Sequence, residues 1–245
     1  MSFITIQITD KTYPAVGQAT QKQAIANLSI GLHEHEFVCL VGPSGCGKTS
    51  LLNIIAGLDH IYEGSIQMGS RLTHPKIAYV FQNPRLLPWR TVRENIELVQ
   101  DNLVADDIDR LLDAMQLNTV QQVYPERLSL GMSRRVAIVR AFAIAPELLL
   151  MDEPFVSLDA PSARQARNLL VNLWQQRPHT VLFVTHDLRE AITLADRIIF
   201  LSSSPMRVIT EVKVPLTQLE RCNEDSIEAF RQTLKQEHSV IHALL

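Results

Sequence analysis

The chain has 245 residues, of which 46% are hydrophobic and 20% charged, and its formal net charge is −3. This composition can form one large domain, or a core with a sub-domain. It excludes intrinsic disorder, collagen-like repeats and a disulfide-stapled miniprotein. The slightly acidic total also argues against a chain-wide basic field for nucleic acid.

Short apolar segments and turn residues alternate from the N-terminus to residue 81. Alternating and β-favouring patterns are typical of strands, whereas an apolar stripe with a closing glycine is typical of a helix. The pattern predicts strands at 2–8, 37–41 and 77–81, a loop at 11–22, a helix at 50–58 that closes near Gly57, and hairpin strands within 63–69.

The remaining chain is first mostly helical and then alternates between strands and helices. We predict helices at 91–100, 105–116 and 129–145, followed by strands at 148–151, 181–185 and 198–201 with helices at 160–175 and 188–194. Ile227, Phe230 and Leu234 have helical spacing. Such alternation predicts a mostly parallel sheet covered on both faces. We expect an α/β core at 1–83 and 146–215, a helical sub-domain at 84–145 and a helical extension at 216–245.

The segment GPSGCGKT at 42–49 matches the pattern G-x-x-x-x-G-K-[ST] between a predicted strand and a predicted helix. Glycines let backbone N–H groups curl around phosphate oxygens, and the helix dipole adds to the attraction. Lys48 would reach the β- and γ-phosphates, and the Thr49 hydroxyl would bind Mg²⁺. The predicted ATP contacts here are Gly42, Pro43, Ser44, Gly45, Cys46, Gly47, Lys48, Thr49 and Ser50.

A second acidic site follows the strand at 148–151. Ligands of open α/β sheets bind beyond the carboxyl ends of the strands. Asp152 suits the Mg²⁺ shell, and Glu153 suits a general base that polarises water. An isolated Asp-Glu pair could equally be two solvated charges, but the upstream phosphate loop favours the functional interpretation.

These motifs and those that follow them resemble the ATP-binding subunits of ABC transporters over roughly residues 3–215. The resemblance is carried by the phosphate loop, Gln82, LSLGM at 128–132, DEP at 152–154, SLD at 157–159 and THD at 185–187. It implies a P-loop NTPase fold: an α/β core with a mostly parallel sheet, an N-terminal antiparallel β portion and an inserted helical sub-domain.

The resemblance also implies a role for each matching residue. Gln82 would touch Mg²⁺ and relay contact with membrane subunits, and His186 would face the γ-phosphate. Ser129 and Gly131 would bind the γ-phosphate held by an opposite subunit, and Asp159 would lie at the dimer seam. Tyr13 stands where an aromatic ring often stacks on adenine, although it could be an ordinary loop tyrosine.

A finer resemblance is to importer ATPases of the nitrate, sulfonate and taurine type. It covers the segments at 81–95, 152–159 and 204–208. The stretch GMSRR at 131–135 also resembles ATPases that move lipids between bacterial membranes, which stays as an alternative. The implied partners are a second copy of the chain, transmembrane permease subunits and a periplasmic substrate-binding protein, with no nucleic acid. The implied location is peripheral, on the cytoplasmic face of the inner membrane.

The sequence departs from the family pattern in the signature segment, which we define as residues 128–132. Leu130 replaces a glycine and Met132 a glutamine, and His35 stands where the family commonly has glycine before the buried strand. Leucine makes a positive φ costly. We therefore expect an ordinary φ at Leu130, with its side chain packed against the helical sub-domain. A catalytically weak, structural subunit is the competing interpretation.

Other features have simpler interpretations. A chromosome-maintenance clamp needs long coiled-coil arms, but only 45 residues separate Gln82 from Leu128. The segment at 33–35 offers two histidines without a third ligand, so we interpret it as a polar loop. Three arginines suit a helix face that forms salt bridges or faces a phosphate: Arg134, Arg135 and Arg140. Three apolar residues suit the sub-domain core and a partner-docking surface equally: Leu86, Leu87 and Trp89.

Three cysteines, Cys39, Cys46 and Cys222, cannot all pair and form no Cys-x-x-Cys motif. This favours a reducing compartment and argues against a structural zinc site. No signal peptide is visible at the N-terminus, and no apolar run is long enough to span a bilayer. We expect a soluble chain.

Overall fold

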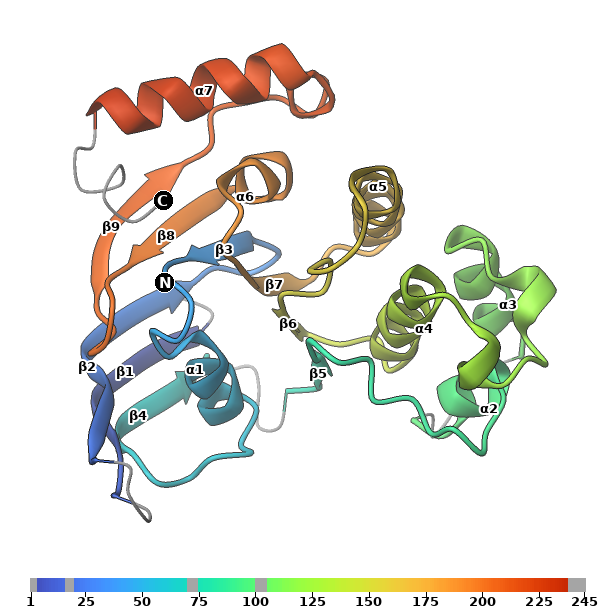
Figure 1. The fold of residues 1–245 in the computed structure, drawn as a ribbon, viewed down its shortest axis with the longest axis horizontal. Coiled ribbons are helices and arrows are strands. Elements are labelled where there is room, and N and C mark those ends of the chain that lie inside the picture. The colour runs from blue at the N-terminus through green and yellow to red at the C-terminus, as the bar shows by residue number, and fades with distance from the viewer. Residues whose placement is uncertain (1–3, 16–19, 70–74, 100–104, 238–245) are drawn as a thin grey trace. The chain divides into compact units, whose positions relative to one another are not determined.

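The computed structural model describes residues 4–15, 20–69, 75–99 and 105–237. The chain forms two compact units, Met1–His74 with Thr180–Leu245 and Pro75–His179. Figure 1 labels their helices and strands. Parts of four predicted segments lie outside the described residues. They are 2–3 of the strand at 2–8, 16–19 of the loop at 11–22, 100 of the helix at 91–100 and 238–245 of the C-terminal extension.

The first unit contains a three-stranded antiparallel sheet in the order β2-β1-β4. Its strands are β1 (Ile4–Tyr13), β2 (Lys22–Leu32) and β4 (Glu63–Met68). The predicted loop at 11–22 is wrong at both ends, because β1 continues to Tyr13 and pairs with the start of β2 after an irregularity at Lys11. The predicted hairpin is also wrong, since β4 pairs with β1. Its antiparallel partner lies far back along the chain.

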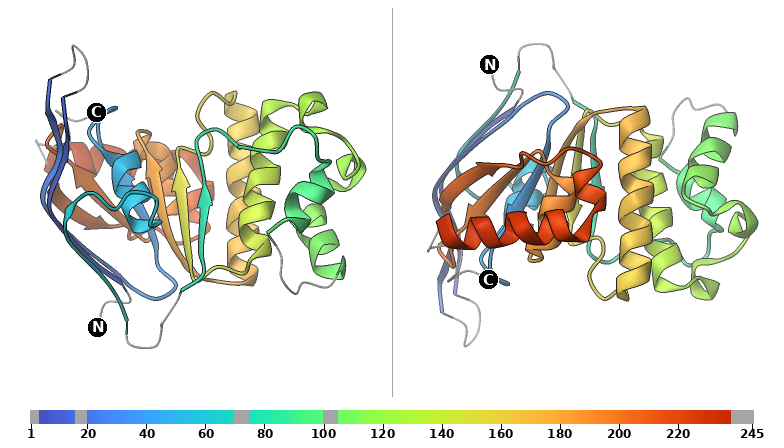
Figure 2. Two further views of the ribbon diagram at one scale, coloured as in Figure 1. Left: turned by 90° about the horizontal axis from the view of Figure 1, so that it is seen from below. Right: turned by 90° about the horizontal axis from the view of Figure 1, so that it is seen from above.

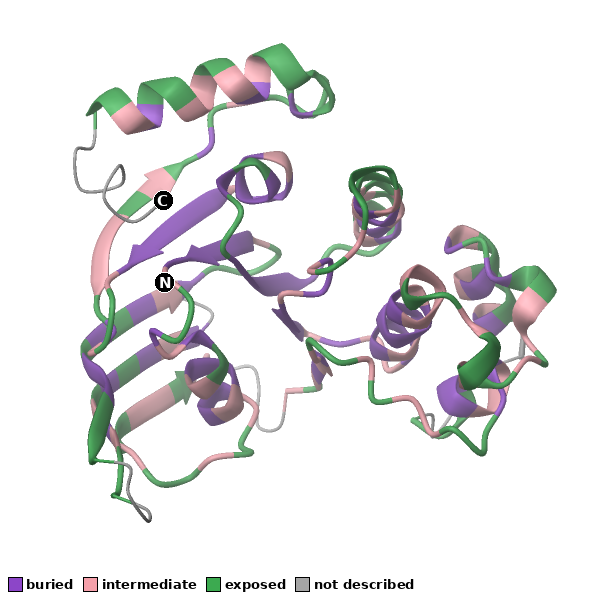
Figure 3. Ribbon diagram, in the orientation of Figure 1, coloured by how far each residue is buried: buried purple, intermediate pink, exposed green. Residues whose placement is uncertain are grey.

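A second group of strands in the first unit has three members that are buried throughout, β3 (Phe37–Val41), β7 (Thr180–Thr185) and β8 (Arg197–Leu201), and an edge strand, β9 (Val208–Lys213), that is partly exposed (Figure 3). The order is β7, β3, β8 and β9. The first three are parallel and β9 is antiparallel. β3, β7 and β8 are continuous apolar runs, as strands covered on both faces require.

The described residues of this unit form three α-helices: α1 (Lys48–Ile55), α6 (Leu188–Leu194) and α7 (Glu224–Glu237). A short 3-10 helix, η3 (Glu220–Cys222), precedes α7. The α1 helix starts two residues earlier than predicted and ends at a left-handed Gly57 (φ 68°), which closes it as a glycine C-terminus does. α7 buries Ile227 and Leu234, whereas Phe230 is partly exposed.

The second unit pairs β5 (Ile77–Val80) with β6 (Leu148–Asp152) in parallel (Figure 2). The part of this unit that the structure describes also has four α-helices. These are α2 (Val92–Glu97), α3 (Ala105–Ala114), α4 (Leu130–Ala143) and α5 (Ala160–Gln176), with 3-10 turns η1 (Asn118–Val120) and η2 (Pro125–Arg127). α4 contacts each of the other three helices. A capping box at Thr91 and Glu94 begins α2.

No helix among the described residues is both long and apolar enough to cross a membrane. All three cysteines are free, with Cys39 and Cys46 buried. The α/β class, with mostly parallel core strands and an antiparallel β portion, agrees with the fold expected from the sequence.

Arg197 at the start of β8 joins three segments of the first unit. Its side chain is only 10% exposed. It donates two hydrogen bonds to Glu36, at 2.8 and 2.9 Å, and one to the Gly31 carbonyl at 2.6 Å. A further ion pair joins it to Glu211. The two bonds to Glu36 hold one planar guanidinium against one carboxylate, the strongest geometry for such a pair.

We expect Arg197→Met to lower the free energy of unfolding by about 3–5 kcal/mol, because it leaves the largely buried Glu36 carboxylate without a cation. Glu211→Gln should cost less than about 1 kcal/mol, since Glu211 is more exposed. Urea unfolding of both variants measures the difference. A loss below about 1 kcal/mol in Arg197→Met would show that the pair contributes little.

Candidate functional site

The phosphate loop at 42–49 connects β3 to α1 in the first unit. Gly45 (φ 74°) and Gly47 (φ 121°) are left-handed, a conformation that other residues adopt only at a cost. A Cβ on Gly47 would lie 3.1 Å from the Ala24 carbonyl oxygen, and one on Gly42 would lie 3.0 Å from Leu201 Cβ. A Cβ on Gly45 would meet only open space, so that glycine is needed for its backbone conformation.

Lys48 is buried and turns back over the loop. Its ammonium donates hydrogen bonds of 2.7 and 2.9 Å to the carbonyls of Gly42 and Pro43. The loop is thus closed around a positive charge. The Cys46 thiol beneath it is buried beside Met206, with a sulfur–sulfur distance of 3.9 Å, and burial raises its pKa. The thiol is therefore part of the support of the loop.

Tyr13 and Ser50 meet beside the loop. The Tyr13 hydroxyl lies 2.8 Å from Ser50 Oγ, and the Lys11 ammonium lies 4.6 Å from the Tyr13 ring centroid. The tyrosine is 39% exposed. The predicted adenine-stacking residue is therefore held against the first turn of α1 with part of its ring open to solvent.

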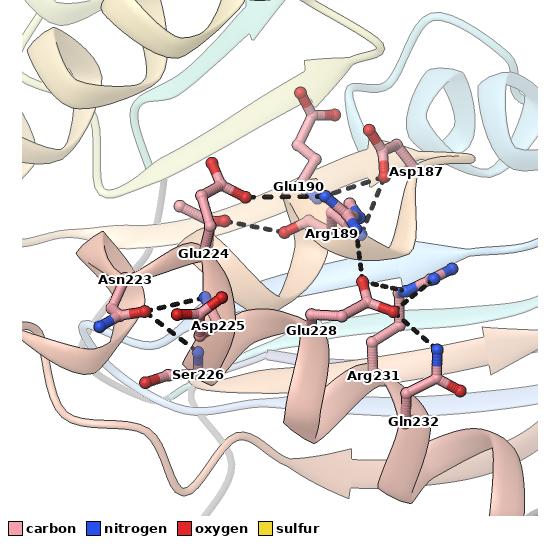
Figure 4. A network of polar contacts seen from close by, with 11 residues as sticks. Asp187, Arg189, Glu190, Asn223, Glu224, Asp225, Ser226, Glu228, Arg231 and Gln232 are labelled. Atoms are coloured by element: carbon pink, nitrogen blue, oxygen red, sulfur yellow. Dashed lines mark hydrogen bonds and ion pairs between the residues drawn. The ribbon is translucent and has the colours of Figure 1, made fainter.

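His186 is exposed directly after β7. The next residue, Asp187, belongs to a network of polar contacts between α6 and α7 (Figure 4). Asp187 caps α6 by accepting the Arg189 N–H at 2.8 Å. Arg189 also bonds Glu228 of α7 at 2.5 Å. Hydrogen bonds from Arg231 and then Gln232 lower the pKa of Glu228 to about 2. These bonds hold α7 against α6, the helix that follows His186. A hollow of about 310 Å³ is lined by His186 together with Arg231 and Lys235 of α7.

Gln82 lies in the second unit, exposed at the end of β5. Phe81 before it stacks on Tyr79 with ring centroids 4.0 Å apart, and the Arg85 guanidinium lies 3.8 Å from the Phe81 centroid. Burial, and then the charge of Asp152, raise the pKa of the Tyr79 hydroxyl. The stack anchors the chain on both sides of Gln82.

The loop after Gln82 exposes Trp89 while its backbone is held from below. Trp89 is 68% exposed, which favours the docking interpretation over sub-domain core for this residue. Asn95, fully buried, accepts the Leu87 N–H at 2.7 Å. Its amide nitrogen donates to the carbonyls of Leu87, Arg90 and Thr91 at 2.9–3.1 Å. This role of Asn95 could not be predicted from the sequence, because an asparagine in a helix gives no signal of the loop that it binds.

The signature segment and residues 157–159 share one hollow of about 200 Å³ in the second unit. Ser129 caps α4 by accepting the Met132 N–H at 3.2 Å. Asp159 caps α5 by accepting the Ser162 N–H at 3.0 Å, and hydrogen bonds from Ser162 lower the Asp159 pKa. Gly131 faces the same space, where an added Cβ would find nothing closer than 3.8 Å. The predicted residues Ser129, Gly131 and Asp159 are thus brought together.

Leu130 corrects one expectation. The predicted absence of a positive φ at Leu130 is confirmed. The predicted packing is wrong, because Leu130 is 45% exposed and lines this hollow instead of packing into the helical part. The reason is its position at the first turn of α4, where the core-facing stripe of the helix has not yet begun. The hollow thus carries an apolar group beside its polar ones.

Asp152 is the last residue of β6, and Glu153 follows it directly. Asp152 is buried, whereas Glu153 is partly exposed. Glu153 has a left-handed backbone (φ 44°), which costs a residue with a side chain about 1–3 kcal/mol and is common where function constrains the chain. Two neighbouring carboxylates of unequal burial suit two different roles.

The candidate residues divide between the two units. The phosphate loop, Tyr13 and His186 belong to the first, and Gln82, the signature segment, the acidic pair and Asp159 to the second. The loop residues fit a nucleotide phosphate, because the loop is preformed around the Lys48 charge. The hydroxyl of Thr49, the amide of Gln82 and the carboxylate of Asp152 are oxygen donors of the kind Mg²⁺ binds. The described residues contain no cluster of three or more His, Cys, Asp or Glu placed to hold a metal.

Comparison with known proteins identifies the family of the chain. The profile of the ABC transporter family matches residues 25–156. An aliphatic sulfonates import ATP-binding protein SsuB of Bacillus cereus is 38% identical over 242 residues, covering 96% of both chains. A nitrate import ATP-binding protein NrtD of Synechococcus elongatus is 36% identical over 221 residues, covering 86% of this chain and 80% of that one.

Solved structures agree as well. The dimeric bacterial ABC transporter cassette MJ0796 superposes with a TM-score of 0.75 at 31% identity, covering 87% of this chain and 100% of that one. The same cassette in a post-hydrolysis state, bound to ADP and Pi, has a TM-score of 0.75 at 30% identity, with the same coverage. The chain therefore belongs to the ABC transporter family, as one of its ATP-binding, ATP-hydrolysing subunits.

Proposed function

We propose that the chain powers the import of a small solute of the nitrate, sulfonate or taurine class, with closure of a nucleotide-bound dimer as the driving step. The observation that carries the proposal is the preformed phosphate loop, in which Lys48 lies at hydrogen-bond distance from two loop carbonyls. The names of the sulfonate and nitrate import relatives support the solute class. They also favour it over the lipid-transport alternative.

Each residue has a part in this proposal. The backbone N–H groups of 42–50 and the Lys48 ammonium bind the phosphates, and Tyr13 stacks on the base. Thr49, Gln82 and Asp152 would hold Mg²⁺, which neutralises phosphate charge. Glu153 is the base that takes a proton from the attacking water, and His186 donates to the γ-phosphate side. Ser129, Gly131 and Asp159 serve the nucleotide held by a second copy.

The proposal extends to partners and organisation. A second copy of the chain completes each nucleotide site, permease subunits bind at the exposed Trp89 loop, and a periplasmic binding protein delivers the solute. The chain then works peripherally on the cytoplasmic face of the inner membrane. We propose 1–83 with 146–215 as its ATP-binding core, 84–145 as its helical sub-domain and 216–245 as its C-terminal extension. The dimeric state of the MJ0796 cassette supports the self-association.

Lys48→Ala and Glu153→Gln should both stop turnover, by different routes. Lys48→Ala removes the charge that meets the phosphates, so ATP binding and hydrolysis both weaken. Glu153→Gln keeps the shape but removes the base, so binding survives while kcat falls about 10²–10⁴-fold. Steady-state ATPase assays and nucleotide titrations measure both, with Lys213→Ala as a surface control. Normal hydrolysis in Glu153→Gln would remove that residue from the mechanism.

Trp89→Ala and Asn95→Ala separate docking from folding. Trp89→Ala should change the free energy of unfolding by less than about 1 kcal/mol, yet abolish co-purification with the permease subunits and lower transport. Asn95→Ala should cost about 2–4 kcal/mol, because it leaves buried loop groups unpaired. Thermal melting and pull-down from membranes measure the two effects. Intact co-purification of Trp89→Ala would contradict the docking role.

Leu130→Gly tests the competing interpretation of a catalytically weak subunit. Leu130 is exposed in the hollow, so its removal should change stability little. Its ordinary φ leaves the N–H groups of the first turn of α4 in place, so we expect turnover to change by less than about tenfold, or ~1.4 kcal/mol. Gly131→Asp, which adds bulk and negative charge in the same hollow, should abolish turnover. A gain well beyond tenfold in Leu130→Gly would instead favour the weak subunit.

A further inference from the structure

Arg134 of α4 points away from solvent and binds the backbone of the loop after β6. It is only 5% exposed. Its guanidinium donates to the carbonyl of Pro154 at 2.6 Å and to that of Glu153 at 3.3 Å. Burial lowers the Arg134 pKa, so this charge is held at some cost. Its Nε is also buried without a hydrogen-bond partner. The side chain is therefore not a solvated helix charge.

Arg140, six residues further along α4, binds a second loop in the same way. Its two terminal nitrogens donate to the carbonyls of Pro84 at 2.8 Å and Arg85 at 3.0 Å. These carbonyls lie two and three residues after Gln82. Each arginine thus holds two consecutive carbonyl groups. Arg140 uses both terminal nitrogens of its planar guanidinium, whereas Arg134 donates both bonds from one terminal nitrogen, Nη1.

The two clamped loops share a second property. In each, one of the two clamped carbonyls belongs to a left-handed residue that is not glycine: Glu153 has a φ of 44° and Arg85 a φ of 48°. Such a conformation persists only where the surroundings hold it in place. The donors from α4 are part of those surroundings, and without them each loop can relax toward an ordinary backbone.

We propose that Arg134 and Arg140 are positioning residues through which helix α4 sets the backbone of the Glu153 loop and of the Gln82 loop together. α4 begins at the signature segment, where Ser129 caps it. Any rotation of this helix therefore moves both loops as one body. This inference rests on the proposed function for its meaning in catalysis, but the two clamps themselves can be measured without any activity.

Arg135 lies between the two clamps in sequence and serves a different purpose. It donates to the Met115 carbonyl at 3.0 Å, at the end of α3, and it lines the hollow of the signature segment. It holds neither of the two loops among the contacts described. The three arginines that the sequence groups together are thus divided by the structure into two loop clamps and one contact within the helical part.

Hydrogen exchange of the full chain, without nucleotide, tests the clamps. In Arg140→Met, we expect amides at 82–87 to exchange at least about tenfold faster, with no change at 153–158. Arg134→Met should show the reverse pattern. Because methionine removes the cost of burying a charge, both variants should fold. The lysine variants should be intermediate, and Arg110→Gln, an exposed α3 arginine, is the control.

A glycine at the strained position supplies a rescue test. Glycine adopts a positive φ without cost, so Arg85→Gly should restore slow exchange at 82–87 in the Arg140→Met background. It should leave the Arg134→Met variant unchanged. The single variant Arg85→Gly is the control and should exchange like the wild type. If it does so and the double variant still exchanges fast at 82–87, then Arg140 does not act by holding the backbone of Arg85.

Activity separates positioning from a general structural role. We expect Arg134→Met and Arg140→Met to lower kcat at least about tenfold while the KM for Mg²⁺-ATP changes less than about threefold, since the phosphate loop is intact. Faster exchange throughout the chain, or unchanged exchange in both loops, would overturn the inference. Locally faster exchange in a protein that hydrolyses no ATP would instead overturn the proposed function and leave the clamps standing.

Discussion

Carbonyl groups in tight loops need hydrogen-bond donors, and in this protein buried side chains supply them at the functional loops. Lys48 binds two carbonyls of the phosphate loop, and Asn95 binds three in the loop that exposes Trp89. Arg134 and Arg140 bind two each. An unpaired buried carbonyl is costly, so each donor limits its loop to one conformation.

This constraint explains why strained backbone occurs where chemistry is expected. Left-handed residues with side chains include Glu153 and Ser157, which flank the turn between the acidic pair and Asp159. Glycine would relieve the strain at Glu153 but would remove the carboxylate. The side chain that we propose as the base is thus kept in a left-handed backbone, and Arg134 donates a hydrogen bond to the carbonyl of that residue.

Two exposed apolar side chains stand on backbone that is held by hydrogen bonds. Trp89 and Leu130 are both exposed on backbone that is well supported, Trp89 by the Asn95 bonds beneath its loop and Leu130 by the Ser129 cap. Rigid presentation lowers the entropy lost on association. The two residues lie on the proposed permease-docking loop and on the proposed dimer-facing hollow.

Local sequence was sufficient for the features that depend on short-range chemistry. The glycines and Lys48 of the phosphate loop, the buried strand β3, the helix periods and the order of the motifs could all be interpreted without a structure. Sheet pairing could not, because the second partner of β1, β4, comes from a distant segment and because β2 and β9 are partly polar. Only the tertiary structure decided that Leu130 is exposed. It also decided which carbonyls Asn95, Arg134 and Arg140 bind, because these carbonyls are not specified by the local sequence. A side chain's residue type states what it can donate, but only the folded chain decides which carbonyl lies within its reach.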